Sequence, residues 1–408
     1  MAQSLSWFSV LFVLGAGQGA FLVISLLTNK VGDLAANRYL ACLALVFTIA
    51  LFDYFLDLTQ LNQQYVQLTV LFWPKEFFYG VFIYFYTREL TQPKHVILRG
   101  RQWLHFLPAF LHVVVTWSIL VTSTNFQNSM FSITPPQENI YSLSLWLFFN
   151  NVETLLSIAH LFIYLALSFR LLHQHRENIK QTFSSIDKIN LHWLSGLLIG
   201  VLCIYFIWVI SVFWPGSAWV NEWLDKFIGI SMVILVYAMA YFGLHQPQIF
   251  KTTEKPIDKQ AHPENLTPST PEQEPSSPSE KYKNSPLTNE LSLAIVSEIK
   301  HHMATKKPYL DSQLSLLQLA DSLGISIHNL SQIINEQLQQ NFFDFINSYR
   351  IEEAKRRLAS TDDQKYNILT IAMEAGFNSR SSFYNAFKKN MTMTPMQYRK
   401  SVQRKIQG

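Results

Sequence analysis

Two stretches decide the fold of this 408-residue chain: residues 316–324 read LLQLADSLG, and residues 368–376 read ILTIAMEAG. Each places a small residue, Ala320 or Ala372, four positions before a glycine, Gly324 or Gly376. The alanine lets two helices cross closely, and the glycine takes a left-handed turn that a Cβ would resist. This spacing predicts two helix-turn-helix units.

The helix expected after Gly324 has a polar outward face. Ser315 and Gln318 form a capping box before the supporting helix, and Ser326 is placed to cap the helix that follows. Helical spacing buries Leu330, Ile333 and Ile334 and leaves outside Ile327, His328, Asn329, Gln332 and Asn335. Because Asn and Gln amides match the bidentate edge of adenine, Gln332 ranks above His328 as a base reader.

The second unit repeats this plan. Asn367 is expected to cap its supporting helix, and Asn378 or Ser379 the helix after Gly376. Phe383 and Phe387 then face inward, and the outward residues are Arg380, Ser381, Ser382 and Asn385. Arg380 is the candidate for a guanine contact, and a contact to phosphate alone is its equal alternative.

Basic residues gather in this part of the chain. From Ala375 onward there are seven Lys and Arg residues, Lys388 and Lys389 among them, and no acidic residue. A long apolar-spaced helix from Phe342 to Leu358 should join the units rigidly and expose Arg350 and Arg357 beside Lys355 and Arg356. Such groups contact phosphate, so the two units and their charge predict binding to double-stranded DNA.

Residues 310–400 resemble the DNA-binding domain of the AraC/XylS family through YLDSQLSLLQLADSLGIS, FFDFINSYRIEEA and IAMEAGFNSRSSFYNAFKK, ending in TPMQYRK. The resemblance implies an all-α domain of seven helices, two recognition helices in adjacent major grooves about 34 Å apart, and RNA polymerase as a partner. Residues 79–112, with YGVFIYFYTRELT and LHFLPAF, resemble the membrane half of AraC-type regulators that carry an N-terminal multi-span region.

Two positions depart from the family pattern. The family usually has a glycine after each recognition helix, where this chain has Gln339 and Thr392. A non-glycine residue in a left-handed cap costs on the order of 1 kcal/mol. We therefore expect these two helix ends to close differently.

The first 250 residues predict a seven-helix transmembrane bundle, since seven apolar stretches approach the roughly 20 residues that a bilayer requires. They are residues 7–27, 39–58, 66–87, 103–121, 141–168, 191–214 and 223–244. The loops after the first, third and fifth carry Lys and Arg, and those after the second, fourth and sixth carry none. This distribution places the N-terminus outside and the C-terminal domain in the cytoplasm of a bacterial inner membrane.

Residues 251–286 separate the membrane domain (1–250) from the DNA-binding domain (287–408). They hold seven of the 16 prolines of the chain, many Ser, Thr and Glu residues, and almost no large apolar residue. A segment of this composition cannot bury enough surface to offset its ordering entropy. We expect a disordered tether.

Polar residues inside the spans suggest a ligand pocket that is open to the outside and binds a small-molecule signal, because such residues are costly in lipid. The candidates are Asp53, Asp57, Lys75, Glu76, Asn150, Asn151, Glu153 and Asp225. Asp53 and Lys75 are a plausible pair, and charge pairing that only holds the bundle together is the alternative. Gly15 and Gly19 suit close helix packing first and a dimer contact second.

Motifs for catalysis, cofactors or metals are absent from the sequence. It has no P-loop, no dinucleotide fingerprint and no HExxH, and His301 and His302 are adjacent rather than at ligand spacing. Cys42 and Cys203 both fall within spans. We expect neither an enzyme nor a metal or cofactor site.

The sequence thus predicts a membrane-bound, sequence-specific transcription regulator that senses a signal through its seven-helix domain. Signal-dependent homodimerisation is the favoured mechanism because a flexible tether transmits orientation poorly; release and restraint of the tether is the other. Two alternatives remain. One is a receptor or transporter whose C-terminal domain docks a protein, and the other is a regulator with a passive membrane anchor.

Overall fold

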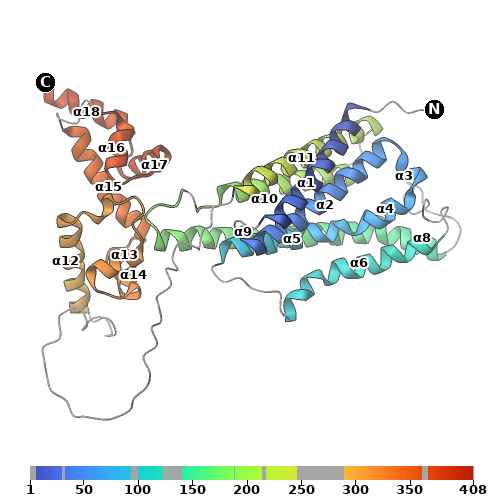
Figure 1. Cartoon of the computed structure of the whole chain (residues 1–408), viewed down its shortest axis with the longest axis horizontal. Helices are drawn as coiled ribbons and strands as arrows, with labels where there is room; N and C mark the ends of the chain where they lie inside the picture. Colours follow the sequence, from blue (N-terminus) through green and yellow to red (C-terminus); the bar gives the residue numbers. More distant parts are fainter. Residues whose placement is uncertain are drawn as a thin grey trace, which may run out of the picture. The chain divides into compact units, whose positions relative to one another are not determined.

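The computed structural model describes residues 6–29, 33–92, 100–122, 127, 140–187, 189–213, 217–245, 289–360 and 366–407. Within these ranges the regular structure is helical, apart from one isolated antiparallel bridge between Phe183 and Ser315. The chain divides into two compact units (Figure 1), Met1–Gln174 with Leu191–Lys255, and His175–Asn190 with Pro256–Gly408. The predicted tether, residues 251–286, lies outside the described residues.

The first unit contains helices α1 to α11 and the short segments between them. Their bounds are α1 Trp7–Thr28, α2 Leu34–Leu58, α3 Leu61–Gln64, α4 Val66–Phe72, η1 Trp73–Phe77, α5 Phe78–Thr91, η2 Gly100–Phe106, α6 Leu107–Ser118, η3 Ile119–Val121, α8 Ile140–Leu147, η4 Phe148–Glu153, α9 Thr154–Thr182, α10 His192–Phe213 and α11 Ala218–Leu244. Of these, α9 crosses from the first unit into the second at Gln174.

Six helices of the described residues are long and apolar enough to cross a membrane: Trp7–Thr28, Leu34–Leu58, Gly100–Val121, Thr154–Thr182, His192–Phe213 and Trp219–Leu244. The third predicted span, residues 66–87, is instead three consecutive segments, α4, η1 and α5. Pro74 lies at the start of the 3-10 segment η1, where a missing N–H and ring clashes interrupt an α-helix. This stretch therefore does not form one continuous apolar helix as the sequence analysis expected.

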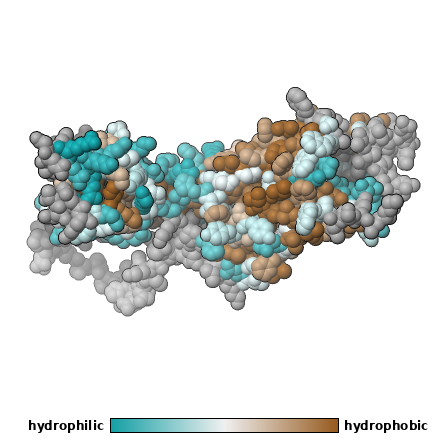
Figure 2. Space-filling view, turned by 90° about the horizontal axis from the view of Figure 1, so that it is seen from above, coloured by the Kyte–Doolittle hydropathy of each residue, from teal (hydrophilic) through white to brown (hydrophobic). Residues whose placement is uncertain are grey.

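Close packing of α1, α2, α5, α10 and α11 forms the apolar core of the first unit. Large apolar side chains also point outward, and Figure 2 shows the brown surface they form. Those more than 60% exposed include Phe21, Ile24, Phe110, Phe206 and Ile234. An apolar exterior around an apolar core is typical of helices surrounded by lipid.

Gly15 and Gly19 pack within the bundle, as predicted from their spacing. A Cβ added at Gly15 would meet Val233 of α11 and Leu51 of α2, and one added at Gly19 would overlap Thr48 Oγ1 of α2. The Thr48 hydroxyl donates to Ala44 O at 2.7 Å. The absence of a side chain thus lets α1 approach both neighbours.

The structure predicts that Gly19→Ala destabilises the first unit and that Gly17→Ala does not. Overpacking of this kind costs about 1 to 3 kcal/mol, whereas a Cβ at Gly17 would meet nothing within 4 Å. The midpoint of thermal unfolding in detergent measures both variants. Equal midpoints for the two variants would contradict the packing described for α1.

The C-terminal domain has seven α-helices in its described residues, the number implied by the family resemblance. They are α12 Asn289–Thr305, α13 Leu316–Leu323, α14 Ile327–Glu336, α15 Phe342–Ala359, α16 Ile368–Glu374, α17 Arg380–Met391 and α18 Pro395–Gln407, with the 3-10 turn η5 Pro308–Leu310 after α12. One apolar core forms around α12 to α14 and the start of α15, and a second around the end of α15, α16 and α17. The helix α15 contributes to both cores and joins them.

The predicted turns are present, and one expectation about helix ends is wrong. Gly324 and Gly376 have φ of 66° and 93°, in the left-handed region that favours glycine. Gln339 and Thr392 also take φ of 54° and 55°, although neither is glycine. The family geometry is kept at these two ends because the helices packed around them outweigh a local cost of about 1 kcal/mol.

Candidate functional site

The first helix-turn-helix unit is held by the caps that the sequence predicts. The Ser315 hydroxyl accepts from Gln318 N, and the Gln318 side chain accepts from Ser315 N at 2.8 Å, which completes the capping box. The Ser326 side chain accepts from Asn329 N at 3.1 Å and caps α14. Leu330, Ile333 and Ile334 are buried as expected.

The outward face of α14 is narrower than the sequence analysis expected. Ile327 and His328 are exposed, and Gln332 and Asn335 are half-buried. The Gln332 amide donates to Glu336 Oε2 at 2.9 Å. Asn329 is buried, at 9% exposure, because it lies one position before Leu330 on the inward side of the first turn. Asn329 is therefore not an outward reader.

The second helix-turn-helix unit presents a more exposed and more basic face. Ser379, not Asn378, is the N-cap of α17, and its hydroxyl accepts from Ser382 N at 3.1 Å. Arg380 is exposed, with its guanidinium carbon 5.2 Å from the centre of the Tyr384 ring. Phe383 and Phe387 are fully buried, as predicted. The exposed residues that follow Arg380 along this face are Ser381, Asn385, Lys388 and Lys389, and Ser382 is half-buried. Lys389 pairs with Asp344 at 2.7 Å.

Arg350 does not face solvent, which corrects its assignment as an exposed phosphate contact. Its side chain is 1% exposed and donates to Tyr309 O at 2.8 Å and to Asp311 O at 2.8 Å. It also donates to the carbonyl of Ser184 at 2.8 Å and to the Ser184 hydroxyl at 3.0 Å. Burial lowers the pKa of Arg350 to about 10, which is still high enough for the guanidinium to be charged at neutral pH. Arg350 therefore connects α15 to residues 309–311 and to Ser184.

Arg357 is half-buried and engaged rather than freely exposed. It donates to Glu353 at 3.0 Å and pairs with Glu374 of α16. Glu353 itself is 6% exposed, and the hydrogen bonds from Arg356, followed by those from Arg357, lower its pKa to about 2. This cluster connects α15 to α16 and leaves Arg356 as the more exposed cation of the group.

Comparison with known proteins identifies the fold of this domain. Residues 319–401 match the family described as helix-turn-helix domain. The C-terminal domain is an AraC-type helix-turn-helix domain. It is 42% identical over 86 residues, 21% of this chain, to an uncharacterized HTH-type transcriptional regulator of Staphylococcus aureus strain COL, of which the match covers 11%. It is 33% identical over 97 residues, 24% of this chain, to the melibiose operon regulatory protein of Escherichia coli, of which the match covers 31%.

These relatives are matched over only part of their length, so the likeness concerns the AraC-type domain alone. A solved structure of a protein of unknown function from Listeria innocua is 28% identical, covers 26% of this chain and 95% of that one, and has a TM-score of 0.23.

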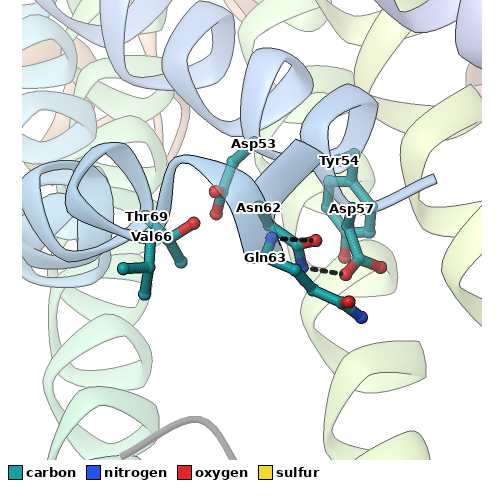
Figure 3. A pocket seen from close by; sticks show the side chains of 7 residues that line it. All are labelled: Asp53, Tyr54, Asp57, Asn62, Gln63, Val66 and Thr69. Atoms are coloured by element: carbon teal, nitrogen blue, oxygen red, sulfur yellow. Dashed lines mark hydrogen bonds between the residues drawn. The ribbon is translucent and has the colours of Figure 1, made fainter. Parts of the chain in front are cut away.

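Outside the AraC-type domain, polar side chains gather at one end of the first unit. A cavity of about 640 Å³ is lined by Asp53, Tyr54, Asp57, Asn62, Gln63, Val66 and Thr69 (Figure 3). Asn62 Nδ2 donates to Asp57 Oδ1 at 2.8 Å. A smaller cavity shares Tyr54 as a lining residue and adds Lys75, Glu76 and Tyr205. The structure thus brings together the predicted residues Asp53, Asp57, Lys75 and Glu76.

Ion pairing inside this cluster is extensive. Lys75 Nζ lies 2.9 Å from Asp53 Oδ2, the pair anticipated from the sequence, and 3.8 Å from Glu76 Oε1. The Tyr205 hydroxyl donates to Glu76 at 3.3 Å. One cation between two carboxylates lowers the cost of each charge within an apolar bundle.

Glu153 and Asp225 border this cluster, Glu153 within electrostatic range of Lys75 and Glu76 and Asp225 within that of Asp57. Glu153 is buried against His112 of α6, with Oε1 and Nε2 3.6 Å apart. Asp225 is half-buried on α11, beside Lys226, which pairs with Glu222 at 2.6 Å. The side chains of Asn150 and Asn151 are outside the described residues, although their backbone belongs to the π-helical segment η4.

The loop that follows α9 was not among the predicted site residues. Ser184, Ser185 and Asp187 contact residues of the AraC-type domain that are more than 100 positions away. Short polar residues in a loop have no periodic pattern from which such contacts could be predicted.

The Glu353 cluster predicts an acid-sensitive domain. The folded pKa of Glu353, about 2, lies below its usual value of 4.5, so its contribution is complete above pH 4.5 and is lost as the pH falls toward 2. We expect Glu353→Gln to lower the free energy of unfolding at neutral pH by about 1 to 2 kcal/mol, and the difference from the wild type to shrink below pH 4.5. Urea denaturation of residues 287–408 at several pH values measures this.

The matched control for this experiment is Glu352→Gln. Glu352 lies next along the helix and pairs with Lys355, but 69% of its side chain is exposed. We expect its substitution to have little effect at any pH. If both variants gave the same pH profile, the assignment of acid sensitivity to Glu353 would be wrong.

Proposed function

We propose that this chain is a membrane-bound, sequence-specific DNA-binding transcription regulator that senses a small-molecule signal through its membrane domain. The observation that carries the proposal is the exposed N-terminal face of α17, led by Arg380, in an AraC-type domain that shares its chain with six apolar helices long enough to cross a membrane. The similarity to HTH-type regulators supports the DNA-binding part.

In this proposal the second helix-turn-helix unit makes the stronger contribution to reading the DNA sequence. Arg380 has the fork of donors that matches guanine O6 and N7, and its stacking beside Tyr384 limits its rotamers before DNA arrives. Ser381, Asn385 and Lys388 extend the face along the same helix. On α14, Gln332 and Asn335 offer amides for adenine, with His328 beside them. An internal hydrogen bond from Gln332 to Glu336 must be exchanged for the base contact.

Binding of selected genomic DNA tests the DNA-reading face. The full-length protein in lipid nanodiscs should enrich discrete fragments, and Arg380→Ala should weaken binding to them by about tenfold or more if the contact is bidentate. A salt titration separates the two roles of Arg380, because loss of a phosphate contact alone reduces the salt dependence by about one unit of slope.

Lys300→Ala is the matched control because it removes one exposed positive charge from α12, outside both helix-turn-helix units. It should change the affinity much less than Arg380→Ala. Enrichment of no fragment, or equal effects of the two substitutions, would sink the assignment of Arg380 as a reader.

The membrane part of the proposal rests on the cavity beside Asp53 and Asp57. Its two carboxylates and the amides of Asn62 and Gln63 suit a small polar signal, and the distribution of Lys and Arg in the loops would open this end to the outside and leave the AraC-type domain in the cytoplasm of a bacterial inner membrane. A ligand that enters there would compete for the Asp53–Lys75 pair and so shift the helices that carry it.

Substitution of the pair tests sensing. We expect Asp53→Asn to abolish the transcriptional response to the signal while the protein still inserts and folds, because Asn keeps the size of the side chain but removes the charge that holds Lys75. A reporter gene measures the response. Glu222→Gln, which breaks the more exposed pair with Lys226, is the control that should respond normally. A normal response of Asp53→Asn would contradict a role of this pair in sensing.

The passive anchor is the second candidate, and the same ion pair favours it, since Asp53 and Lys75 satisfy one another without a ligand.

In either case the partners we propose are double-stranded DNA, the lipid bilayer and, by family resemblance, RNA polymerase. Homodimerisation would raise the effective concentration of a second pair of readers. A protein-docking role is less well supported, because the exposed face of α17 is basic and polar rather than apolar.

A further inference from the structure

The loop between α9 and α10 belongs to the same compact unit as the AraC-type domain. Residues His175–Asn190 cluster with the C-terminal residues, although α9 and α10 are both candidate membrane spans. His175 is buried and its Nε2 lies 2.9 Å from Ile189 O, which closes the base of the loop. The tip of the loop, residues 183–187, is called the docking loop below.

The docking loop contacts the first helix-turn-helix unit and the connecting helix α15. Ser184 N donates to Leu314 O at 3.2 Å, and Phe183 forms an antiparallel bridge with Ser315, the N-cap of α13. Ser184 is 1% exposed, and both its carbonyl and its hydroxyl accept hydrogen bonds from Arg350. A buried guanidinium that donates twice to one loop residue makes this contact specific.

The same loop reaches the second recognition helix. Asn378 Nδ2 donates to Ser185 Oγ, and Ser379 Oγ donates to Asp187 Oδ2 at 2.6 Å. Because Ser379 is the N-cap of α17, the Asp187 carboxylate lies at the positive end of that helix, next to the exposed Arg380. A DNA phosphate that approaches α17 would bind at the N-terminus of this helix and accept a hydrogen bond from the Ser379 hydroxyl.

We propose that the docking loop is an interaction surface through which the membrane domain restrains the second DNA reader, with Asp187 occupying the position of a DNA phosphate at the N-terminus of α17. The inference rests on the proposed function, since it concerns the same DNA-binding face. The docked loop and the DNA backbone compete for Ser379 and Asn378. Release of the loop is the step that permits full DNA binding.

This arrangement gives the membrane domain a second connection to the reader. Residues 251–286 connect the two domains through the chain, but the docking loop is continuous with α9 and precedes α10 by only a few residues. A shift of either helix moves the loop directly, without passing through the tether. The contact also spans both helix-turn-helix units, because it touches the N-cap of α13 and the N-cap of α17. Its release therefore exposes the N-terminal end of one helix in each unit.

The test compares full-length variants in lipid nanodiscs for binding to a duplex selected from genomic fragments. Asp187→Ala removes the competing carboxylate and should tighten binding by about five- to tenfold, because a larger fraction of the protein is then competent to bind. Asp187→Asn keeps an oxygen that accepts from Ser379, and its affinity should fall between the two. Glu177→Ala is the matched control, since it removes an equal charge from the same segment at a 51% exposed side chain that pairs with Lys180.

Hydrogen exchange gives a second readout that does not depend on affinity. The Ser184 N–H, which donates to Leu314 O, should be protected without DNA and should exchange faster when DNA is bound. If Asp187→Ala bound DNA no more tightly than Glu177→Ala, or if residues 183–187 stayed protected on DNA, the competition would be refuted while the wild type still bound DNA. Failure of every variant to bind DNA would instead overturn the proposed function and the competition with it.

Discussion

The buried guanidinium of Arg350 is the interaction on which the arrangement of the C-terminal domain depends. A charged group at 1% exposure must have its donors satisfied, and here the acceptors come from η5, from the residue after it and from the docking loop. The same contact explains Gly376. A Cβ at that position would overlap Tyr309 O and lie 3.0 Å from Arg350 Nε, so the turn before α17 is closed against the residues that Arg350 holds. One side chain on α15 thus fixes the start of the second recognition helix relative to η5 and the first helix-turn-helix unit.

In the first compact unit a different constraint applies, the cost of charge in an apolar surrounding. Its exterior is apolar, and Lys75 pairs with the carboxylates of Asp53 and Glu76 beside two adjoining cavities. A charged ligand beside these three groups would alter the balance of charge among them. The break in the helix at Pro74 places Lys75 and Glu76 in a 3-10 segment, where their direction differs from that in a continuous α-helix.

Local signals predicted much of the fold. The caps at Ser315, Ser326 and Asn367 and the turns at Gly324 and Gly376 follow from chemistry that acts within four residues. The helix ends at Gln339 and Thr392 did not follow, since the packing of a whole domain there outweighs a local preference. The rule that glycine belongs at a left-handed cap is a preference of about 1 kcal/mol and not a prohibition.

The candidate site was predicted less completely because charge was taken as a sign of exposure. Arg350 lies four residues after the buried Ile346 and four before the buried Ala354, so helical spacing alone indicates the inward side of α15. The contacts of the docking loop, in contrast, join residues far apart in the sequence and depend on the folded domain. The pairing of Asp53 with Lys75 could be predicted because charged residues in apolar spans are few and are costly unless they pair.

The central claim is that a chain with membrane-spanning helices reads specific DNA sequences, and genome-wide crosslinking in cells tests it most directly. Full-length protein should occupy discrete sites while it remains in the membrane fraction. A variant with both Gln332→Ala and Arg380→Ala should reach the same membrane fraction and lose those sites. Absence of discrete sites under several growth conditions, or sites that persist in the double variant, would contradict the account.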